Sequence, residues 1–290
     1  MNLLKIILII GKRLIGENKK GEKMGRVFAS SDWHGCGNVA DKVFDFLKED
    51  DTLYFIGDAI DRGPDGIKIL TRLLSDSRVK FIMGNHEQFM EECLPEAIST
   101  LKASNDILSY EWIYSCWISN GGSKTINGLY DLSIPEVEEL YQKIKNLPYQ
   151  LLYNSPKGHT VLLEHAGYSP FTLPSRRHDP LWDREHFRDV WDTGYRPDFC
   201  GDPDTTYLVH GHTPVQYLTY EYGYFGKPAP GPNYLRERHD FLYSDKPDLP
   251  KPEIIRYCEG HKFCIDLCTI VSNRIALLNL DTFETIYIDG

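Results

Sequence analysis

The sequence predicts an α/β fold built around a sheet of parallel strands. Five short apolar runs, rich in Val, Ile, Leu, Phe or Tyr, each end in a small residue and then a polar side chain able to bind metal. Runs of this length and composition are typical of buried strands. They are "RVFASSDWHG" (26–35), "TLYFIGD" (52–58), "VKFIMGNHE" (79–87), "TVLLEHAG" (160–167) and "TYLVHGHTP" (206–214).

Helical periodicity lies between the first three strands, which predicts successive βαβ units with parallel strands. The apolar residues at helical spacing are Val39, Val43, Phe46 and Leu47 in one stretch and Ile67, Leu70, Leu73 and Leu74 in the other. Ligands of such sheets bind beyond the carboxyl ends of the strands. All five polar clusters fall at these ends, so we expect them to form one site.

The segment from about 88 to 150 is mostly helical in pattern and is expected to cap one end of the site. Its clearest helix is "IPEVEELYQKIKNLPYQ", in which Pro135 stands near the start. Val137, Leu140, Tyr141 and Ile144 fall on one face of this helix. A stretch from about 222 to 252 has six prolines and many aromatics without periodicity, and predicts an irregular insertion near the site entrance.

The C-terminal tail is predicted to form strands, whereas the N-terminal stretch is predicted to lie outside the fold. The tail "FCIDLCTIVSNRIALLNLDTFETIYID" alternates and turns like a pair of antiparallel hairpins, and predicts the edge of a second sheet. The apolar stretch at the start is too short to span a bilayer and has no cleavage pattern behind it. Because Met24 directly precedes the first strand, we hypothesise that residues 1–23 are an extension outside the fold, with one domain over 24–290.

The net charge and the cysteine content limit which molecules the protein is expected to bind and in which cellular compartment it is expected to work. The formal net charge of -10 means that phosphate must be attracted locally, by metal ions or a few arginines, which argues against general nucleic-acid binding. The seven cysteines are odd in number and include no C-x-x-C pair, which argues against a disulfide framework and a structural zinc site. We expect reduced thiols, a cytoplasmic location and no membrane association.

The polar clusters contain the residue types of a metal site with two ions. Asp32 and His34 are two residues apart after a strand, a spacing that tends to put both side chains on one side. Asp58 can supply a third ligand and bridge to a second cation, since a carboxylate has two oxygens. Asn85, His165 and His212 would complete that second site. Mixed oxygen and nitrogen ligands suit Mn²⁺, Fe or Zn²⁺, and paired ions of this kind serve in-line displacement at phosphorus.

Taken together, "SDWHG", "GDAIDRG", "GNHE", "EHAG" and "GHTP" resemble the signature of the calcineurin-like metallophosphoesterases. The resemblance is to their phosphoprotein phosphatase branch, which includes bacterial and phage serine/threonine phosphatases and symmetrical diadenosine tetraphosphate hydrolases. It implies a four-layer α/β/β/α sandwich. It also implies one metal held by Asp32, His34 and Asp58, and a second held by Asp58, Asn85, His165 and His212.

The resemblance further implies roles in catalysis and phosphate binding. His86 matches the general acid, oriented by Asp61, and Arg62 matches an arginine that clamps phosphate oxygens. Arg184, in "PLWDRE", resembles the second phosphate-binding arginine in a looser motif, with Arg176 and Arg177 nearby.

Three features of the sequence qualify these assignments. His210 is an alternative metal ligand to His212, but His212 is favoured because it occupies the histidine position of the GHT motif. "IDLCT" replaces a more usual Asp-x-Gly near the end of the chain. "WISNGGSKT" (117–125) resembles a stretch common in bacterial members of the family, and the sequence assigns it no catalytic role.

The expected function is hydrolysis of phosphate monoesters, foremost phosphoserine and phosphothreonine in proteins, by direct attack of a metal-bridging hydroxide while His86 protonates the leaving oxygen. Two divalent ions are expected, Mn²⁺ first and Fe or Zn²⁺ as alternatives. One alternative function is hydrolysis of diadenosine tetraphosphate, and aromatics such as Tyr217, Tyr220, Tyr222, Tyr224 and Phe225 would suit either substrate. A scaffold without activity is the alternative of another class, opposed by the presence of Asp61, Arg62 and His86.

Overall fold

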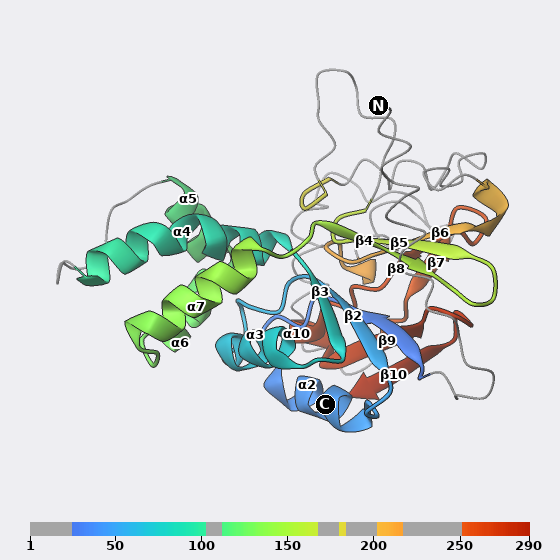
Figure 1. Cartoon of the computed structure of the whole chain (residues 1–290), viewed down its shortest axis with the longest axis horizontal. Coiled ribbons are helices and arrows are strands. Elements are labelled where there is room, and N and C mark those ends of the chain that lie inside the picture. Colours follow the sequence, from blue (N-terminus) through green and yellow to red (C-terminus); the bar gives the residue numbers. More distant parts are fainter. Residues whose placement is uncertain (1–24, 103–111, 168–179, 184–201, 217–250) are drawn as a thin grey trace, which may run out of the picture.

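In a computed structural model of the chain, two five-stranded mixed sheets form the centre of the fold (Figure 1). The structure describes residues 25–102, 112–167, 180–183, 202–216 and 251–290. The proposed extension (1–23), most of the proposed insertion (222–252) and Arg184 therefore lie outside the described residues.

The first sheet has the strand order β10-β9-β1-β2-β3. Its strands are β1 (Val27–Ser30), β2 (Thr52–Ile56), β3 (Val79–Ile82), β9 (Arg274–Asn279) and β10 (Thr285–Asp289). The first three are parallel and are joined by α2 (Gly37–Phe46) and α3 (Gly66–Ser75). The βαβ prediction for the first half of the chain is thus confirmed.

The second sheet has the order β4-β5-β6-β8-β7. Its strands are β4 (Gln150–Asn154), β5 (Thr160–Glu164), β6 (Thr206–His210), β7 (Ile255–Tyr257) and β8 (Lys262–Cys264), and the short helix η3 (Pro203–Thr205) leads into β6. The inner strands β5, β6 and β8 run parallel, and β4 and β7 flank them in antiparallel fashion. The predicted strands before "EHAG" and "GHTP" are therefore neighbours in this sheet.

The prediction for the tail was wrong in one respect, because its hairpin belongs to the first sheet. β9 pairs antiparallel with β1, with Phe28 opposite Asn279 and Ala29 opposite Leu278. β9 is apolar on both faces: Leu277 joins the core under the helices, whereas Leu278 lies between the sheets. A strand with two apolar faces is buried on both when it pairs with the open edge of β1. Only β8 of the tail lies in the second sheet, and α10 (Thr269–Ser272) follows it.

The two sheets pack face to face through an apolar core that both supply. Ala29, Ile56 and Ile82 of the first sheet share this core with Val161 and Val209 of the second. The other face of the first sheet packs against helices in a larger apolar cluster. The described residues thus show helical, sheet and sheet layers; the outer helical layer implied by the resemblance is not among them.

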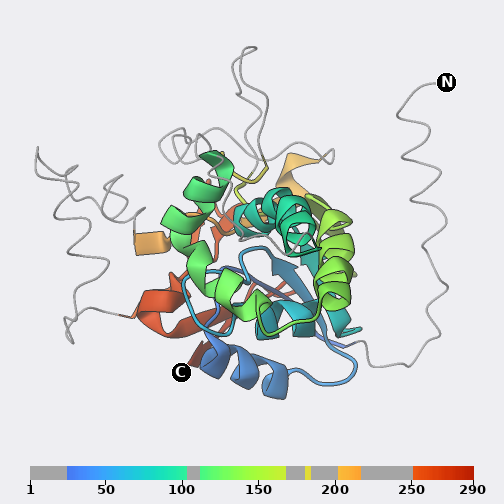
Figure 2. The ribbon, with the colours of Figure 1, turned by 90° about the vertical axis from the view of Figure 1, so that its left-hand side faces the viewer.

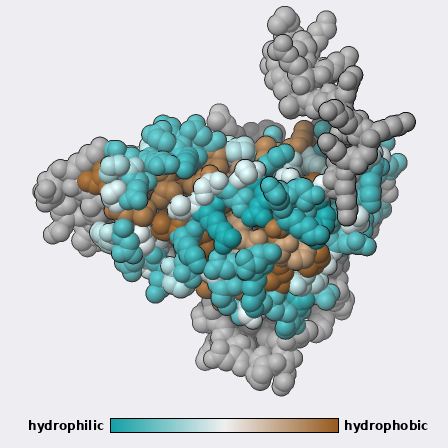
Figure 3. Space-filling view, turned by 60° about the horizontal axis from the view of Figure 1, so that its bottom comes forward, coloured by the Kyte–Doolittle hydropathy of each residue, from teal (hydrophilic) through white to brown (hydrophobic). Residues whose placement is uncertain are grey.

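The helices after β3 project from one side of the sheets (Figures 1 and 2). They are α4 (Asn85–Lys102), α5 (Trp112–Trp117), η1 (Ile118–Gly122), α6 (Ser123–Leu129) and α7 (Ile134–Lys145). The predicted amphipathic helix is confirmed as α7, which buries Val137, Leu140 and Ile144 and begins with a capping box between Ser133 and Glu136. We call α4 to α7 the helical cap; apolar residues interrupt its polar surface in Figure 3.

Candidate metal centre

Loops that follow five strands of both sheets bring the predicted site residues together. Asp32 and His34 follow β1, Asp58 follows β2, and Asn85 begins α4 just after β3. The second sheet contributes residues after β5 and β6, namely His165 and His212. All six side chains are buried, with exposed fractions of 7% or less.

Two groups of possible metal ligands share Asp58. One consists of His34, Asp58 and His86 and the other of Asp58, His165 and His212, with ligand atoms within 4.8 Å of one another in each group. Oδ2 of Asp58 lies 3.7 Å from Nε2 of His34, and Oδ1 lies 3.4 Å from Nε2 of His165. Asp58 therefore offers a different oxygen to each group, an arrangement that suits a carboxylate bridging two cations.

Asn85 and Asp32 lie beside these two groups, although Asp32 belongs to neither, and His86 stands in the first group where the resemblance implied Asp32. Oδ1 of Asn85 lies 2.9 Å from both Nε2 of His165 and Nδ1 of His212. The carboxylate of Asp32 accepts a hydrogen bond from the backbone N–H of His212, 3.1 Å from Oδ2. Gly211 permits this approach, because a Cβ there would lie 2.1 Å from Oδ2 of Asp32. Hydrogen bonds thus join the loops of the two sheets at the site.

His86 lies between the residues that were expected to orient it and to bind phosphate beside it. With hydrogen on Nδ1, its ring donates to Oδ2 of Asp61 at 2.5 Å, while a guanidinium N–H of Arg62 donates to Nε2 at 3.1 Å. The backbone N–H of His86 donates to Oδ1 of Asp58 at 3.0 Å. Asp61 is fully buried and Arg62 is exposed. A buried acid–imidazole pair next to an exposed guanidinium suits proton donation to a phosphoryl group bound alongside.

The donor set fits divalent cations. Burial, together with the charge of Asp266, raises the pKa of Asp32 well above its usual range, a cost that a bound cation would remove. Burial and Arg62 lower the pKa of His34, which keeps its imidazole neutral as a ligand must be. Burial lowers the pKa of His165, but Asp58 and Asp32 outweigh it and raise the value to about 10. A bound cation would take the place of this proton between the carboxylates and the ring, because a ligating imidazole is neutral. Carboxylate, amide and imidazole donors together suit Mn²⁺, Fe or Zn²⁺.

His210 faces away from these groups. Its Nδ1–H donates to the carbonyl oxygen of Gly211 at 3.1 Å, and its Nε2 accepts from the hydroxyl of Tyr257 at 2.8 Å. Burial lowers its pKa to about 3, so the ring is neutral. The geometry therefore favours His212 over His210 as a ligand.

Sequence reasoning assigned no role to two buried carboxyl groups at the site. Glu87, the last residue of "GNHE", accepts from the backbone N–H groups of Asp58, Ala59 and Gly84 at 2.7, 2.8 and 3.1 Å. Burial and Asp58 raise the pKa of Glu87 to about 7. Asp266 is also buried, and burial raises its pKa to about 6. Glu87 lies in "GNHE" and Asp266 lies in "IDLCT". Their positions in these motifs are the sequence feature that could have identified them as site residues.

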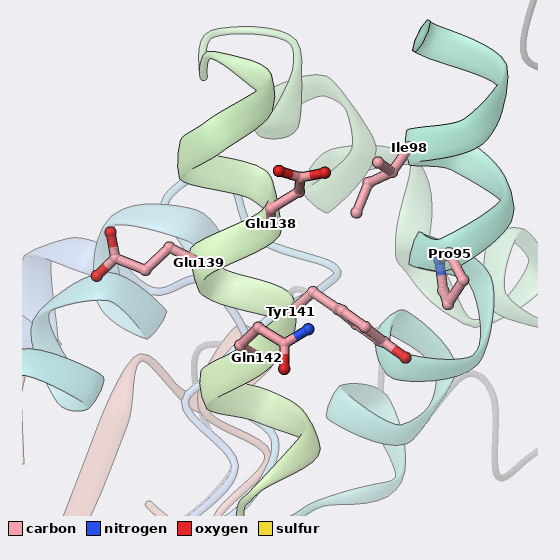
Figure 4. A pocket seen from close by; sticks show the side chains of 6 residues that line it. All are labelled: Pro95, Ile98, Glu138, Glu139, Tyr141 and Gln142. Carbon is pink, nitrogen blue, oxygen red and sulfur yellow. The ribbon is translucent and has the colours of Figure 1, made fainter. Parts of the chain in front are cut away.

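A separate hollow of about 500 Å³ lies on the helical cap, between α4 and α7 (Figure 4). It contains none of the predicted site residues. It is lined by Pro95, Ile98, Glu138, Glu139, Tyr141 and Gln142.

The chain is similar to known proteins over much of its length. The family model described as calcineurin-like phosphoesterase matches residues 25–262. The serine/threonine-protein phosphatase 1 of Salmonella typhimurium is 30% identical over 166 residues, which cover 55% of this chain and 68% of that protein. A symmetrical bis(5'-nucleosyl)-tetraphosphatase of Delftia acidovorans is 24% identical over 149 residues, which cover 50% of this chain and 45% of that protein.

A solved structure described provisionally as a diadenosine tetraphosphatase shares the fold. Its TM-score is 0.50 at 16% identity, over 92% of this chain and 94% of that one. The family match spans every predicted metal ligand. The chain therefore belongs to the calcineurin-like phosphoesterase family, as a metal-dependent phosphatase.

Proposed function

We propose that the protein hydrolyses phosphate monoesters of serine and threonine in other proteins, using two divalent cations, with Mn²⁺ as the first choice. The observation that carries the proposal is the trio of His86, Asp61 and Arg62 beside two ligand groups that share Asp58. A scaffold would have no need of this trio, since it serves proton transfer and phosphate binding rather than the fold.

The residues divide the work of the reaction. Asp32, His34, Asp58, Asn85, His165 and His212 would hold the cations. When bound, these cations would supply an activated water and neutralise charge on the phosphoryl oxygens. Arg62 would bind phosphate oxygens through its planar fork. His86 would protonate the leaving oxygen, held in place by Asp61.

The similarity to a serine/threonine phosphatase over 68% of that protein supports a phosphoprotein as substrate. The free cysteines among the described residues support the reducing cytoplasm as the setting. Within the described ranges, none of the helices has the length and apolar content needed to cross a bilayer.

A second substrate class is favoured by one observation. The indole of Trp182 is 38% exposed and lies edge-on to the ring of His212, with centroids 5.9 Å apart. Its Nε1–H donates to Oε1 of Gln88 at 2.8 Å, and its ring also contacts Phe89. An exposed aromatic next to a proposed ligand could stack on an adenine, as hydrolysis of diadenosine tetraphosphate would require.

The deciding experiment compares turnover on two substrates by metal-stripped protein reloaded with Mn²⁺. We expect faster turnover of a phosphoserine peptide than of diadenosine tetraphosphate. A preference for the dinucleotide would make the protein a nucleotide hydrolase. Inactivity on both substrates and on an aryl phosphate would leave only the scaffold interpretation.

The Trp182→Ala variant gives an independent measure of adenine binding. If the site binds adenine, the KM for diadenosine tetraphosphate should rise while the KM for an aryl phosphate stays the same. Tyr130→Ala is the matched control, because Tyr130 is 62% exposed on the turn after α6. Equal effects of both variants would argue against a specific role for Trp182.

A further inference from the structure

The motif "WISNGGSKT" (117–125) lies against the residues that hold the proposed general acid. It runs from the end of α5 through η1 into α6, and so belongs to the helical cap. Its indole and one of its hydroxyls reach Asp61, which is 56 to 64 residues earlier in the chain. The motif is therefore part of the surroundings of the site.

Trp117 and Thr125 hold the carboxylate of Asp61, to which His86 also donates. The Nε1–H of Trp117 donates to both oxygens, at 2.9 Å from Oδ2 and 3.1 Å from Oδ1. The hydroxyl of Thr125 donates to Oδ1 at 2.5 Å. Trp117 and Thr125 are 2% and 1% exposed. A buried carboxylate with several donors has its charge stabilised and its orientation restricted.

The same segment also accepts hydrogen bonds from the backbone N–H groups of Asp61 and Arg62. The N–H of Asp61 donates to Oγ1 of Thr125 at 2.9 Å, and the N–H of Arg62 donates to the carbonyl oxygen of Gly121 at 3.1 Å. Both Asp61 and Arg62 have left-handed backbones, with φ of 69° and 63°. Such conformations persist in residues other than glycine only when contacts with the surroundings stabilise them. The hydrogen bonds to Thr125 and Gly121 of the helical cap are among these contacts.

Gly121 also allows the cap to approach Arg62 closely. Its φ is 101°, and a Cβ there would lie 2.8 Å from Cγ and 3.0 Å from the backbone N of Arg62. Any side chain at this position would push against the residue that we expect to bind phosphate. Glycine is therefore required both by the backbone angle and by the contact.

We propose that Trp117, Gly121 and Thr125 are positioning residues for the reaction, with Trp117 and Thr125 acting on His86 through Asp61 and Gly121 acting on Arg62. This inference rests on the proposed phosphatase activity, which it deepens. It assigns the cap a part in setting the geometry of the general acid and of the phosphate clamp.

The test uses the dependence of the rate on the leaving group. A general acid matters most when the departing oxygen is strongly basic, so phenyl phosphate needs His86 more than p-nitrophenyl phosphate does. In Thr125→Val and Trp117→Phe, kcat for phenyl phosphate should fall roughly 10- to 100-fold, which is part of the roughly 10²- to 10⁴-fold that a positioned general acid contributes. The fall for p-nitrophenyl phosphate should be clearly smaller. Thr125→Ser, which keeps the hydroxyl, should restore the wild-type ratio.

Matched variants separate positioning from general damage. Thr206→Val removes another buried hydroxyl, which donates to the carbonyl oxygen of Asp202, and should leave the ratio of the two rates unchanged. Gly121→Ala should raise KM for both esters by displacing Arg62. Gly158→Ala has the same kind of backbone strain, with φ of 92° but no atom within 4 Å of the added Cβ, and should leave KM unchanged.

A second measurement does not depend on turnover. In metal-free protein, the Nδ1 proton of His86 should give a downfield NMR signal that disappears in His86→Asn. This signal should shift or broaden in Thr125→Val and Trp117→Phe and stay in place in Thr206→Val. An unchanged signal together with an unchanged rate ratio in both variants would overturn the inference. A wild-type protein inactive on all phosphate esters would instead overturn the proposed function, and the NMR result would then decide the positioning alone.

Discussion

Six residues at or beside the proposed metal centre have left-handed backbones, which side chains other than glycine rarely adopt. They are Asp32, His34, Asp58, Asp61, Arg62 and His212, with φ between 43° and 69°. Each such conformation costs roughly 1 to 3 kcal/mol and is retained where the surroundings hold it in place. The strain is concentrated at the loop positions that must turn side chains from separate strands toward one point.

Cys268 also has a left-handed backbone, and it lies in the motif that departs from the usual Asp-x-Gly. In "IDLCT", Cys268 takes the place of the glycine of the more usual Asp-x-Gly, and its φ is 52°. Its backbone N–H donates to Oδ1 of Asp266 at 2.7 Å. The tight turn that glycine would favour is therefore kept here by a cysteine.

Replacing His86 by asparagine should lower kcat by roughly 10² to 10⁴, the usual contribution of a general acid. Asparagine offers no ring nitrogen in place of Nε2 to pass a proton to the leaving oxygen. Metal content, measured by elemental analysis, should stay at two ions per chain, because we assign His86 to acid catalysis rather than to metal binding. His159→Asn is the control, since His159 donates to the carbonyl oxygen of Leu280 away from the site.

A wild-type rate in His86→Asn would remove the acid assignment. Loss of one metal ion along with activity would instead make His86 a ligand, as its place beside His34 and Asp58 would allow.

At the scale of elements, one carboxylate fastens the start of β1 to the turn before β2. Asp51 accepts from the backbone N–H and the guanidinium of Arg26 and from the backbone N–H of Lys48. Its side chain is 1% exposed and that of Arg26 is 33% exposed. Burial raises the pKa of Asp51, but the hydrogen bonds outweigh it and lower the pKa below the usual value.

Asp51→Asn should therefore lower the free energy of unfolding by about 2 kcal/mol at pH 7, as expected for hydrogen bonds to a charged group. Because the folded-state pKa is depressed, the stabilisation is present above the unfolded value of about 3.9 and is lost as the pH falls through the folded value. Urea denaturation at pH 7 and at about pH 3 should show the gap between wild type and variant closing in acid. Asp131→Asn, on an exposed turn, should have no effect at either pH; a gap that widens in acid would contradict the ion pair.

At the scale of the whole molecule, the proposed metal centre joins the two sheets. Asp32, His34, Asp58 and Asn85 follow strands of the first sheet, and His165 and His212 follow strands of the second. Elsewhere the sheets meet through the apolar core that they share and through hydrogen bonds such as the one from the hydroxyl of Tyr153 to Asp281. A cation at Asp58 would therefore add a direct link between the two halves of the fold.

Binding of Mn²⁺ should accordingly raise the Tm of the metal-stripped protein. At a concentration one hundred times Kd, a ligand that binds only the folded state contributes about 2.7 kcal/mol, which corresponds to roughly 4 to 5 °C for a chain of this size. Differential scanning calorimetry with and without chelator measures the shift. Asp58→Asn should abolish most of the shift, whereas Tyr130→Ala should keep it. An equal shift in Asp58→Asn would place the bound ion elsewhere.

The five strands that end in polar clusters, the parallel order of β1 to β3 and helix α7 were readable from the sequence, whereas β4 and β7 were not. These features depend on neighbours in the chain: apolar runs with strand length, helical spacing, and polar residues directly after strands. The family resemblance then ordered Asp32, Asp58 and His212 into a ligand set, and the structure brings them together at one edge.

Tertiary structure alone decided three things. It placed the terminal hairpin on the open edge of β1, it turned His210 toward Tyr257 and away from the ligand groups, and it brought Trp117 and Thr125 onto Asp61. Each depends on which buried surfaces and donors meet after packing, between residues 47 or more positions apart in the chain. Local patterns specify what each segment can form, whereas packing of the sheets and the cap determines which of these segments touch.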